Sequence, residues 1–250
     1  MVFDRRLIED YKKQGFLVVP NLIDRETVEN IREQVNSILD KPDERPEGVV
    51  LNLEGSTIAD KNSSSARNKD IRGAAFLVRF IPFFKDIAKN PNLLQFVRAI
   101  IGPKIRVFRD QALFKPPGGQ KKPVHQDQSY FRINPPDELI TAWIAIDDAT
   151  TSNGCMHYIP ESHQHGLFPI EADPERPVHH IPKTNHINLP TSRACPVTAG
   201  SVIFHHGCTL HFSETNHSHD WRRAIIFHYT TKTAISENME LNNQISLELE

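Results

Sequence analysis

The stretch TAWIAIDD, residues 141–148, is rich in branched and aromatic residues and is followed by the turn-forming run ATTSNG. This composition is typical of a β-strand that ends at a turn. Similar segments recur on both sides of it: KIRVFRDQALF at 104–114, MHYIP at 156–160, RACPVTAGSVIF at 193–204 and AIIFHYTT at 224–231. Short strands separated by Pro, Gly, Asn and Ser clusters predict an antiparallel sandwich or barrel.

The residues before this β-rich part predict helices. Leu7, Ile8 and Tyr11 form an apolar stripe that stops at Gly15, and Asp24 is a suitable N-cap for a second helix. That helix would bury one face, made of Val28, Ile31, Val35, Ile38 and Leu39. Helical spacing returns in FFKDIA and PNLLQFVRAIIG, which ends at Gly102-Pro103.

Two segments predict surface loops: the polar run 41–70 and the proline-rich run 169–190. We therefore expect one domain over 1–250, of the α+β class but mainly β. Residues 1–103 would be mostly helical support and loop, 104–230 the β core, and 231–250 a C-terminal tail.

Composition argues against nucleic-acid-binding, membrane-spanning and secreted proteins. The 250 residues carry a net charge of −2, so no basic surface predicts a nucleic-acid partner. No run approaches the ~18 apolar residues of a membrane span, and the acidic first residues do not fit a signal peptide. The cysteines, Cys155, Cys195 and Cys208, are odd in number and far apart, which is typical of reduced core thiols in a cytoplasmic protein.

The motif HQDQSY, residues 125–130, places an imidazole and a carboxylate two positions apart. On a strand, His125 and Asp127 would project from one face while Gln126 pointed elsewhere. Two side chains seldom hold a metal well, so the motif predicts a third ligand. Residues 200–229 offer several candidates: His205, His206, His211, His217, His219 and His228.

An arginine pair, Arg222 and Arg223, stands at the entry to the strand AIIFHY. An arginine that points into an apolar barrel needs an anion, and its planar guanidinium suits a carboxylate. Either a protein carboxylate or a ligand could supply that anion. Because adjacent strand residues face opposite ways, we expect at most one of the two to reach inside.

Taken in order, three pieces of the chain resemble the phytanoyl-CoA dioxygenase family. They are HQD at 125–127, TAWIAIDDATTSNGCMHYIPESHQHG at 141–166 and GSVIFHHGCTLHFSETN at 200–216. The chain departs from the family pattern in HFSETN, where a glycine often follows the histidine, and in IPESH, where IPGSH is usual. The resemblance implies a double-stranded β-helix (a jelly roll, cupin-like) with N-terminal helices buttressing one sheet.

The resemblance also implies a set of site residues. It assigns iron(II) to His125, Asp127 and His211, which together form the facial triad of non-haem iron oxygenases. It assigns the distal carboxylate of 2-oxoglutarate to Arg222, assisted by the Ser213 hydroxyl. Gln126 and Trp143 match positions that line this cosubstrate, and Gln111 and Arg72 are candidates for the remaining contact. Four basic residues near the motif could attract an anionic substrate: Lys115, Lys121, Lys122 and Arg132.

The implied activity is hydroxylation of an unactivated C–H bond in a small molecule of natural-product or acyl type. Iron(II), 2-oxoglutarate and O2 would be needed, and succinate and CO2 would be released. Two alternatives remain open: a non-catalytic ligand- or metal-binding jelly-roll protein, and a zinc hydrolase with the same three ligands. A zinc hydrolase leaves Arg222 and Ser213 without a role, and a scaffold does not need three aligned ligands.

Overall fold

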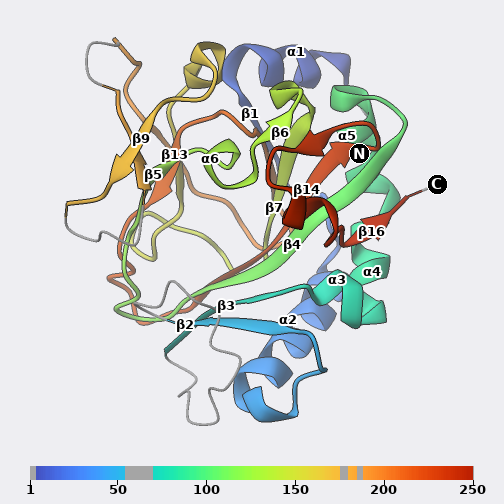
Figure 1. The fold of residues 1–250 in the computed structure, drawn as a ribbon. Helices are drawn as coiled ribbons and strands as arrows, with labels where there is room; N and C mark the ends of the chain where they lie inside the picture. Colours follow the sequence, from blue (N-terminus) through green and yellow to red (C-terminus); the bar gives the residue numbers. More distant parts are fainter. Residues whose placement is uncertain (1–3, 54–69, 175–179, 185–187, 250) are drawn as a thin grey trace.

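The computed structural model describes residues 4–53, 70–174, 180–184 and 188–249, and its largest feature is an antiparallel sheet. The strands of this sheet are β1 Phe16–Val19, β2 Val50–Leu53, β3 Ile71–Ala75, β4 Ile105–Lys115, β7 Leu139–Ala145, β12 Val202–His206, β14 Arg222–Thr231 and β16 Leu247–Glu248. They lie in the order β1-β12-β7-β14-β4-β3-β2, and β16 pairs with β4 (Figure 1). β7, which contains most of TAWIAIDD, is therefore a central strand.

A smaller four-stranded sheet packs against the large one. It consists of β5 Lys122–His125, β8 Met156–Tyr158, β11 Arg193–Cys195 and β13 His211–Ser213, in the order β11-β8-β13-β5. Between the two sheets lies an apolar cluster that includes Trp143, Ile203 and Ile226 from the large sheet and Met156 and Tyr158 from the small one. Two antiparallel sheets around one interior confirm the predicted jelly roll.

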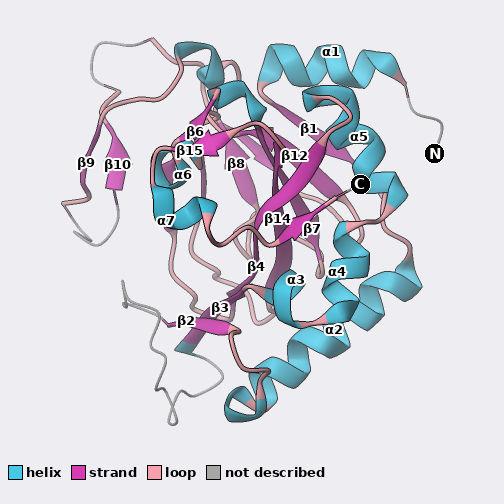
Figure 2. Ribbon diagram, turned by 45° about the vertical axis from the view of Figure 1, so that its right-hand side comes forward, coloured by secondary structure: helices cyan, strands magenta, loops and turns pink. Residues whose placement is uncertain are grey.

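Helices cover the other face of the large sheet, as Figure 2 shows. They are α1 Arg5–Gln14, α2 Arg25–Asp40, α3 Leu77–Phe80, α4 Pro82–Ala88 and α5 Pro91–Ile101. α1 ends at Gly15, Asp24 caps α2 through the Thr27 amide, and α5 stops at Gly102, each as predicted. No helix in the described ranges is both long and apolar enough to cross a membrane.

Successive side chains of β7 are buried on opposite faces of the sheet, and this explains why its sequence shows no polar face. Ile140, Ala142 and Ile144 pack under the helices, whereas Trp143 and Ala145 face the interior between the sheets. A strand buried on both faces reads as a continuous apolar run. All three cysteines are buried and unpaired, as their scattered positions predicted.

The sequence predicted helices and loop before residue 103 and strands after it, but the large sheet also takes strands from the first part. β1, β2 and β3 come from the part predicted as helices and loop, and they extend the large sheet at both edges. β1 is the apolar run FLVV, which pairs with β12, a strand nearly two hundred residues away. Such pairing cannot be seen in local periodicity. The expected loop 41–70 contains β2, and its residues 54–69 lie outside the described ranges.

Two other segments contain secondary structure that the sequence did not predict. In the proline-rich run, β9 Ile170–Ala172 and β10 His180–Pro182 form an antiparallel pair. The C-terminal tail folds back as β15 Ile235–Ser236, α7 Met239–Asn242 and β16. β15 pairs with β6 Ile133–Asn134, which follows α6 Gln128–Phe131. The tail therefore reaches the end of the barrel that carries the HQD motif.

We expect Gly200→Ala to destabilise the fold more than Gly118→Ala. Both glycines have positive φ, +85° and +75°, which costs an alanine about 1–2 kcal/mol. Only at Gly200 would the added Cβ lie 2.5 Å from the Ile23 carbonyl oxygen, whereas no described atom lies within 4 Å at Gly118. Urea unfolding of both variants measures the difference, and equal losses would contradict the predicted clash.

Candidate metal centre

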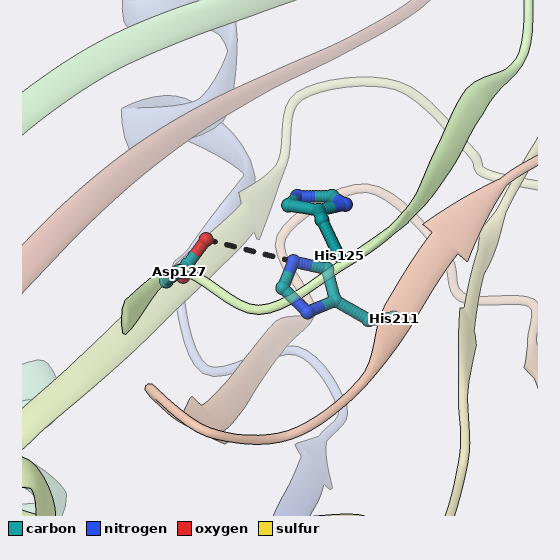
Figure 3. A group of neighbouring side chains, drawn as sticks. All are labelled: His125, Asp127 and His211. Atoms are coloured by element: carbon teal, nitrogen blue, oxygen red, sulfur yellow. Dashed lines mark ion pairs between the residues drawn. The ribbon is translucent and has the colours of Figure 1, made fainter. Parts of the chain in front are cut away.

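His125, Asp127 and His211 converge in the interior of the barrel (Figure 3). Each offers one ligand atom, and these atoms all lie within 4.8 Å of one another. All three side chains are buried. The pairing of β13 with β5 sets His211 directly opposite His125, so that the two ring centroids are 4.2 Å apart. The structure thus brings together the three predicted ligands in a space that could hold one ion.

Asp127 reaches this position in a different way from the one predicted. β5 ends at His125, and Asp127 has helical backbone angles, φ −60° and ψ −34°, at the position that precedes α6. The side chains of His125 and Asp127 therefore converge because the chain turns between them, not because they alternate along one strand. Its Oδ1 lies 3.6 Å from Nε2 of His211.

Gln126, which the family resemblance placed among the residues that line the cosubstrate, is hydrogen-bonded to the backbone through both ends of its amide. Its Nε2 donates to the carbonyl oxygens of Gly166 and Cys208, and its Oε1 accepts from the amide of Phe168. A side-chain amide with these partners ties three backbone segments together. We therefore assign Gln126 a structural role.

Backbone carbonyls orient both histidines. Nδ1 of His125 donates to the Pro123 carbonyl and Nδ1 of His211 to the Thr209 carbonyl, each at 2.8 Å. Because a carbonyl oxygen only accepts, the proton of each neutral ring lies on Nδ1 and Nε2 keeps its lone pair. Burial lowers the pKa of both histidines, so both are neutral near pH 7 and their Nε2 atoms can bind a metal.

The carboxylate of Asp127 is held by residues that the sequence did not single out. Its Oδ2 accepts hydrogen bonds from Thr141 Oγ1 at 2.6 Å and from His205 Nε2 at 3.0 Å. Burial alone would raise the pKa of Asp127, but His211 and the His205 hydrogen bond outweigh it and hold the pKa well below its ordinary value. The group is therefore an ionised carboxylate inside the barrel.

Arg222 lies inside the barrel beside Trp143, and no carboxylate of the described residues forms an ion pair with it. Its side chain is buried, its Nε has no hydrogen-bond partner among the described residues, and its guanidinium carbon lies 5.7 Å from the centre of the Trp143 ring. Burial lowers the pKa of Arg222 to about 10, so it remains charged at neutral pH. A buried guanidinium nitrogen without a hydrogen-bond partner is costly, and it indicates a place for an anionic ligand.

Arg223 points to the opposite side of the strand. Its Nε and Nη2 reach the two oxygens of Asp147 at 2.7 and 2.9 Å, and Nη1 donates to Asn36 of α2. The bidentate pair joins β14 to the segment after β7, and the hydrogen bond to Asn36 fastens α2 to the large sheet. As predicted for adjacent strand residues, only one of the two arginines faces the interior.

Lys115 is also part of this buried pocket, although the sequence suggested an exposed lysine near the motif. It pairs with Arg222 across β4 and β14, it is only 5% exposed, and its Nζ donates to Ser213 Oγ at 2.8 Å. Its position at the end of a strand rich in apolar residues was the available signal. Two cations and one hydroxyl thus meet at one end of the interior.

The other residues predicted to line the cosubstrate site lie at different positions relative to the interior between the sheets. Trp143 is fully buried in the interior, and its Nε1 has no hydrogen-bond partner among the described residues. Gln111 is half-buried on β4 and pairs with Ile226 of β14, and Arg72 lies on the neighbouring strand β3. Trp143 therefore remains a candidate wall of the pocket, together with Gln111.

Comparison with known proteins places the chain in a family. The family model described as phytanoyl-CoA dioxygenase matches residues 11–224. The human peroxisomal phytanoyl-CoA dioxygenase is 24% identical over 253 residues, covering 96% of this chain and 72% of that protein. The mouse phytanoyl-CoA dioxygenase domain-containing protein 1 is 32% identical over 157 residues, covering 59% of this chain and 52% of that protein.

Solved structures show the same fold. The non-haem α-ketoglutarate-dependent carbocyclase SnoK from nogalamycin biosynthesis superposes with a TM-score of 0.75 at 23% identity, covering 99% of this chain and 94% of SnoK. The epimerase SnoN superposes with a TM-score of 0.73 at 20% identity, covering 95% of this chain and 88% of SnoN. Since the family model spans most of the chain, this protein belongs to the phytanoyl-CoA dioxygenase family.

Proposed function

We propose that this protein is an iron(II)- and 2-oxoglutarate-dependent oxygenase that hydroxylates an unactivated C–H bond of a small molecule. One observation carries the proposal. A buried group of two histidines and one carboxylate lies in the same interior as a buried arginine, Arg222, for which the described residues supply no counter-ion. The first feature suits a metal and the second suits a dicarboxylate cosubstrate.

The donor atoms fit iron(II). His125 and His211 present neutral Nε2 atoms and Asp127 presents a carboxylate oxygen, which together form the 2-His-1-carboxylate set of non-haem oxygenases. A hydrolytic zinc centre could use the same three atoms. It would leave the buried guanidinium of Arg222 without a ligand to bind, so iron is the better fit.

The cation pocket fits the distal carboxylate of 2-oxoglutarate. Arg222 supplies an unpartnered guanidinium, which can bind a carboxylate through two parallel hydrogen bonds. Ser213 accepts from Lys115, so its own hydroxyl proton is available for an anion. Trp143 lies beside the guanidinium and provides an apolar wall. Lys115 adds a second positive charge to this end of the pocket.

When bound, iron and 2-oxoglutarate supply the oxidising chemistry that activates dioxygen and removes a hydrogen from the substrate. The chain contributes orientation and exclusion of water. The two sheets bury the metal-binding side chains, and the carbonyls of Pro123 and Thr209 fix the imidazole rings. Preorganised donors of this kind need not rearrange during the reaction.

Relatives support a small-molecule substrate. SnoN was solved in complex with Fe3+, α-ketoglutarate and nogalamycin RO, and EvdO2 with 2-oxoglutarate. Several sequence relatives are named for phytanoyl-CoA, an acyl conjugate. We therefore propose a natural-product or acyl-type substrate for this protein. We also propose that 1–250 is a single domain and that the protein is cytoplasmic, supported by its three buried free thiols.

The test uses the purified protein. Under anaerobic conditions, iron(II) and 2-oxoglutarate should together produce the charge-transfer absorbance of a chelated 2-oxo acid. With oxygen and ascorbate, conversion of 2-oxoglutarate to succinate should follow and should increase with an acceptable acyl or natural-product substrate. A hydrolase would work with zinc and without oxygen, and a non-catalytic protein would form no succinate. Absence of both the absorbance and succinate would refute the proposal.

A further inference from the structure

Oδ2 of Asp127 lies at the centre of a buried network of side chains from four strands, β7, β8, β12 and β14. Thr141 of β7 and His205 of β12 both contact Oδ2, at 2.6 and 3.0 Å. Thr141 is in turn 2.9 Å from Nδ1 of His228 in β14, and His205 is 3.1 Å from the hydroxyl of Tyr158. All of these side chains are buried.

The protons of this network can be assigned from the atoms alone. An ionised carboxylate only accepts, so Thr141 and His205 Nε2 must both donate to Asp127. His205 Nδ1 is then an acceptor for the Tyr158 hydroxyl, and Thr141 Oγ1 is an acceptor for Nδ1–H of His228. Every hydrogen bond therefore points toward the carboxylate, in two branches that meet at Oδ2.

This arrangement leaves the two oxygens of Asp127 unequal. Oδ2 is held by two donors, whereas Oδ1 faces His211 at 3.6 Å. Rotating the carboxylate would break both hydrogen bonds at once and leave buried donors without partners, which is expensive. We infer that His205 and Thr141 are positioning residues that make Asp127 bind the metal through Oδ1 alone.

The number of oxygens through which Asp127 binds would set how many positions stay open on the metal. This inference rests on the proposed iron centre. A carboxylate that binds through both oxygens occupies two positions, whereas one that binds through a single oxygen occupies one. With His125 and His211, single-oxygen binding leaves three positions of an octahedron for cosubstrate and dioxygen. Binding through both oxygens would leave only two.

His205 itself is not suited to be a ligand in this geometry. Among the described residues, the group with metal-binding spacing comprises His125, Asp127 and His211 and does not include His205. Both ring nitrogens of His205 already have partners, Asp127 and Tyr158. Its neighbour His206 bonds instead to Asp137 at 3.2 Å, away from the carboxylate of Asp127. His206 is therefore a matched control on the same strand.

The experiment compares variants that remove a donor with variants that keep it. Thr141→Val and His205→Leu remove the hydrogen bonds to Oδ2, whereas Thr141→Ser and His205→Gln retain a donor. Iron(II) affinity is measured anaerobically by competition with a chelator, and the visible spectrum of the cobalt(II)-loaded protein reports coordination. His206→Gln is the control, and thermal unfolding is recorded for every variant.

We expect Thr141→Val and His205→Leu to weaken iron binding by about 10- to 100-fold, the usual cost of losing an outer-shell partner. Their cobalt spectra should change, while Thr141→Ser and His206→Gln should resemble the wild type and His205→Gln should recover most of the loss. Wild-type affinity and spectrum in Thr141→Val and His205→Leu would overturn the inference, even if their unfolding temperatures fell. A wild-type protein that binds neither iron nor cobalt would overturn the proposed function as well.

Discussion

Replacing His211 with alanine should abolish 2-oxoglutarate turnover and weaken iron(II) binding more than any other single histidine substitution in 200–229. The side chain supplies one of three donor atoms that lie within 4.8 Å of one another, and the neighbouring ring of His205 already has partners for both nitrogens. Loss of a ligand should exceed the roughly 10- to 100-fold cost of losing an outer-shell partner. His125→Ala and Asp127→Ala should behave in the same way.

Other histidines of the same segment provide the controls. His217 and His219 are exposed in the turn before β14, and His206 bonds to Asp137. His217→Ala and His219→Ala should leave iron binding and turnover unchanged, and His206→Ala should keep iron binding even where it lowers stability. Anaerobic iron titration and succinate release measure both properties. A His211→Ala protein with wild-type iron affinity would show that the third ligand is assigned wrongly.

The sequence indicated the three candidate metal ligands but not how the chain brings them together. The spacing of His125 and Asp127 suggested one face of a strand, whereas the chain turns between them and Asp127 begins a helical turn. Spacing alone could not choose His211 from six histidines, and that choice came from the family resemblance. The pairing of His211 with His125 is a contact between distant strands, and no local pattern encodes it.

The supporting residues were harder to predict for the same reason. Thr141, His205 and His228 stand on three different strands, and each is unremarkable in its own segment. Thr141 and His205 contact the carboxylate of Asp127, and His228 contacts Thr141. These contacts exist only after the sheet has formed. The hydrogen bonds of Gln126 to the Gly166 and Cys208 carbonyls were likewise not predictable, because these residues lie far along the chain from the HQD motif.

The fold was predicted best where periodicity is local. α1, α2 and α5 begin and end at capping or breaking residues that the sequence shows directly. β1 was missed as a strand because four apolar residues have no distinctive period, and its partner lies far along the chain. The same limit applies to the pair β9 and β10, where prolines favoured a loop.

Substitutions of the adjacent arginines should have different effects: one should weaken 2-oxoglutarate binding, and the other should lower the stability of the fold. Arg222→Gln removes a buried guanidinium that forms no ion pair within the described part of the chain, so we expect a higher apparent KM for 2-oxoglutarate. Truncating one partner of a buried charged pair costs about 2–5 kcal/mol. At 1.4 kcal/mol per factor of ten, this is at least about 25-fold in affinity. Folding should be little affected, because the free protein loses no ion pair.

Arg223→Gln should have the reverse profile. It breaks the bidentate contact with Asp147, and it also breaks the hydrogen bond to Asn36 that fastens α2 to the sheet. Hydrogen bonds to charged groups contribute about 1.5–3 kcal/mol, so urea unfolding should show a loss of this order while the KM for 2-oxoglutarate stays near the wild-type value. Titration of 2-oxoglutarate by the anaerobic absorbance, followed by unfolding of the same samples, measures both properties in both variants. If Arg223→Gln raised the KM and Arg222→Gln did not, β14 would be shifted by one residue, because such a shift exchanges the two faces of a strand.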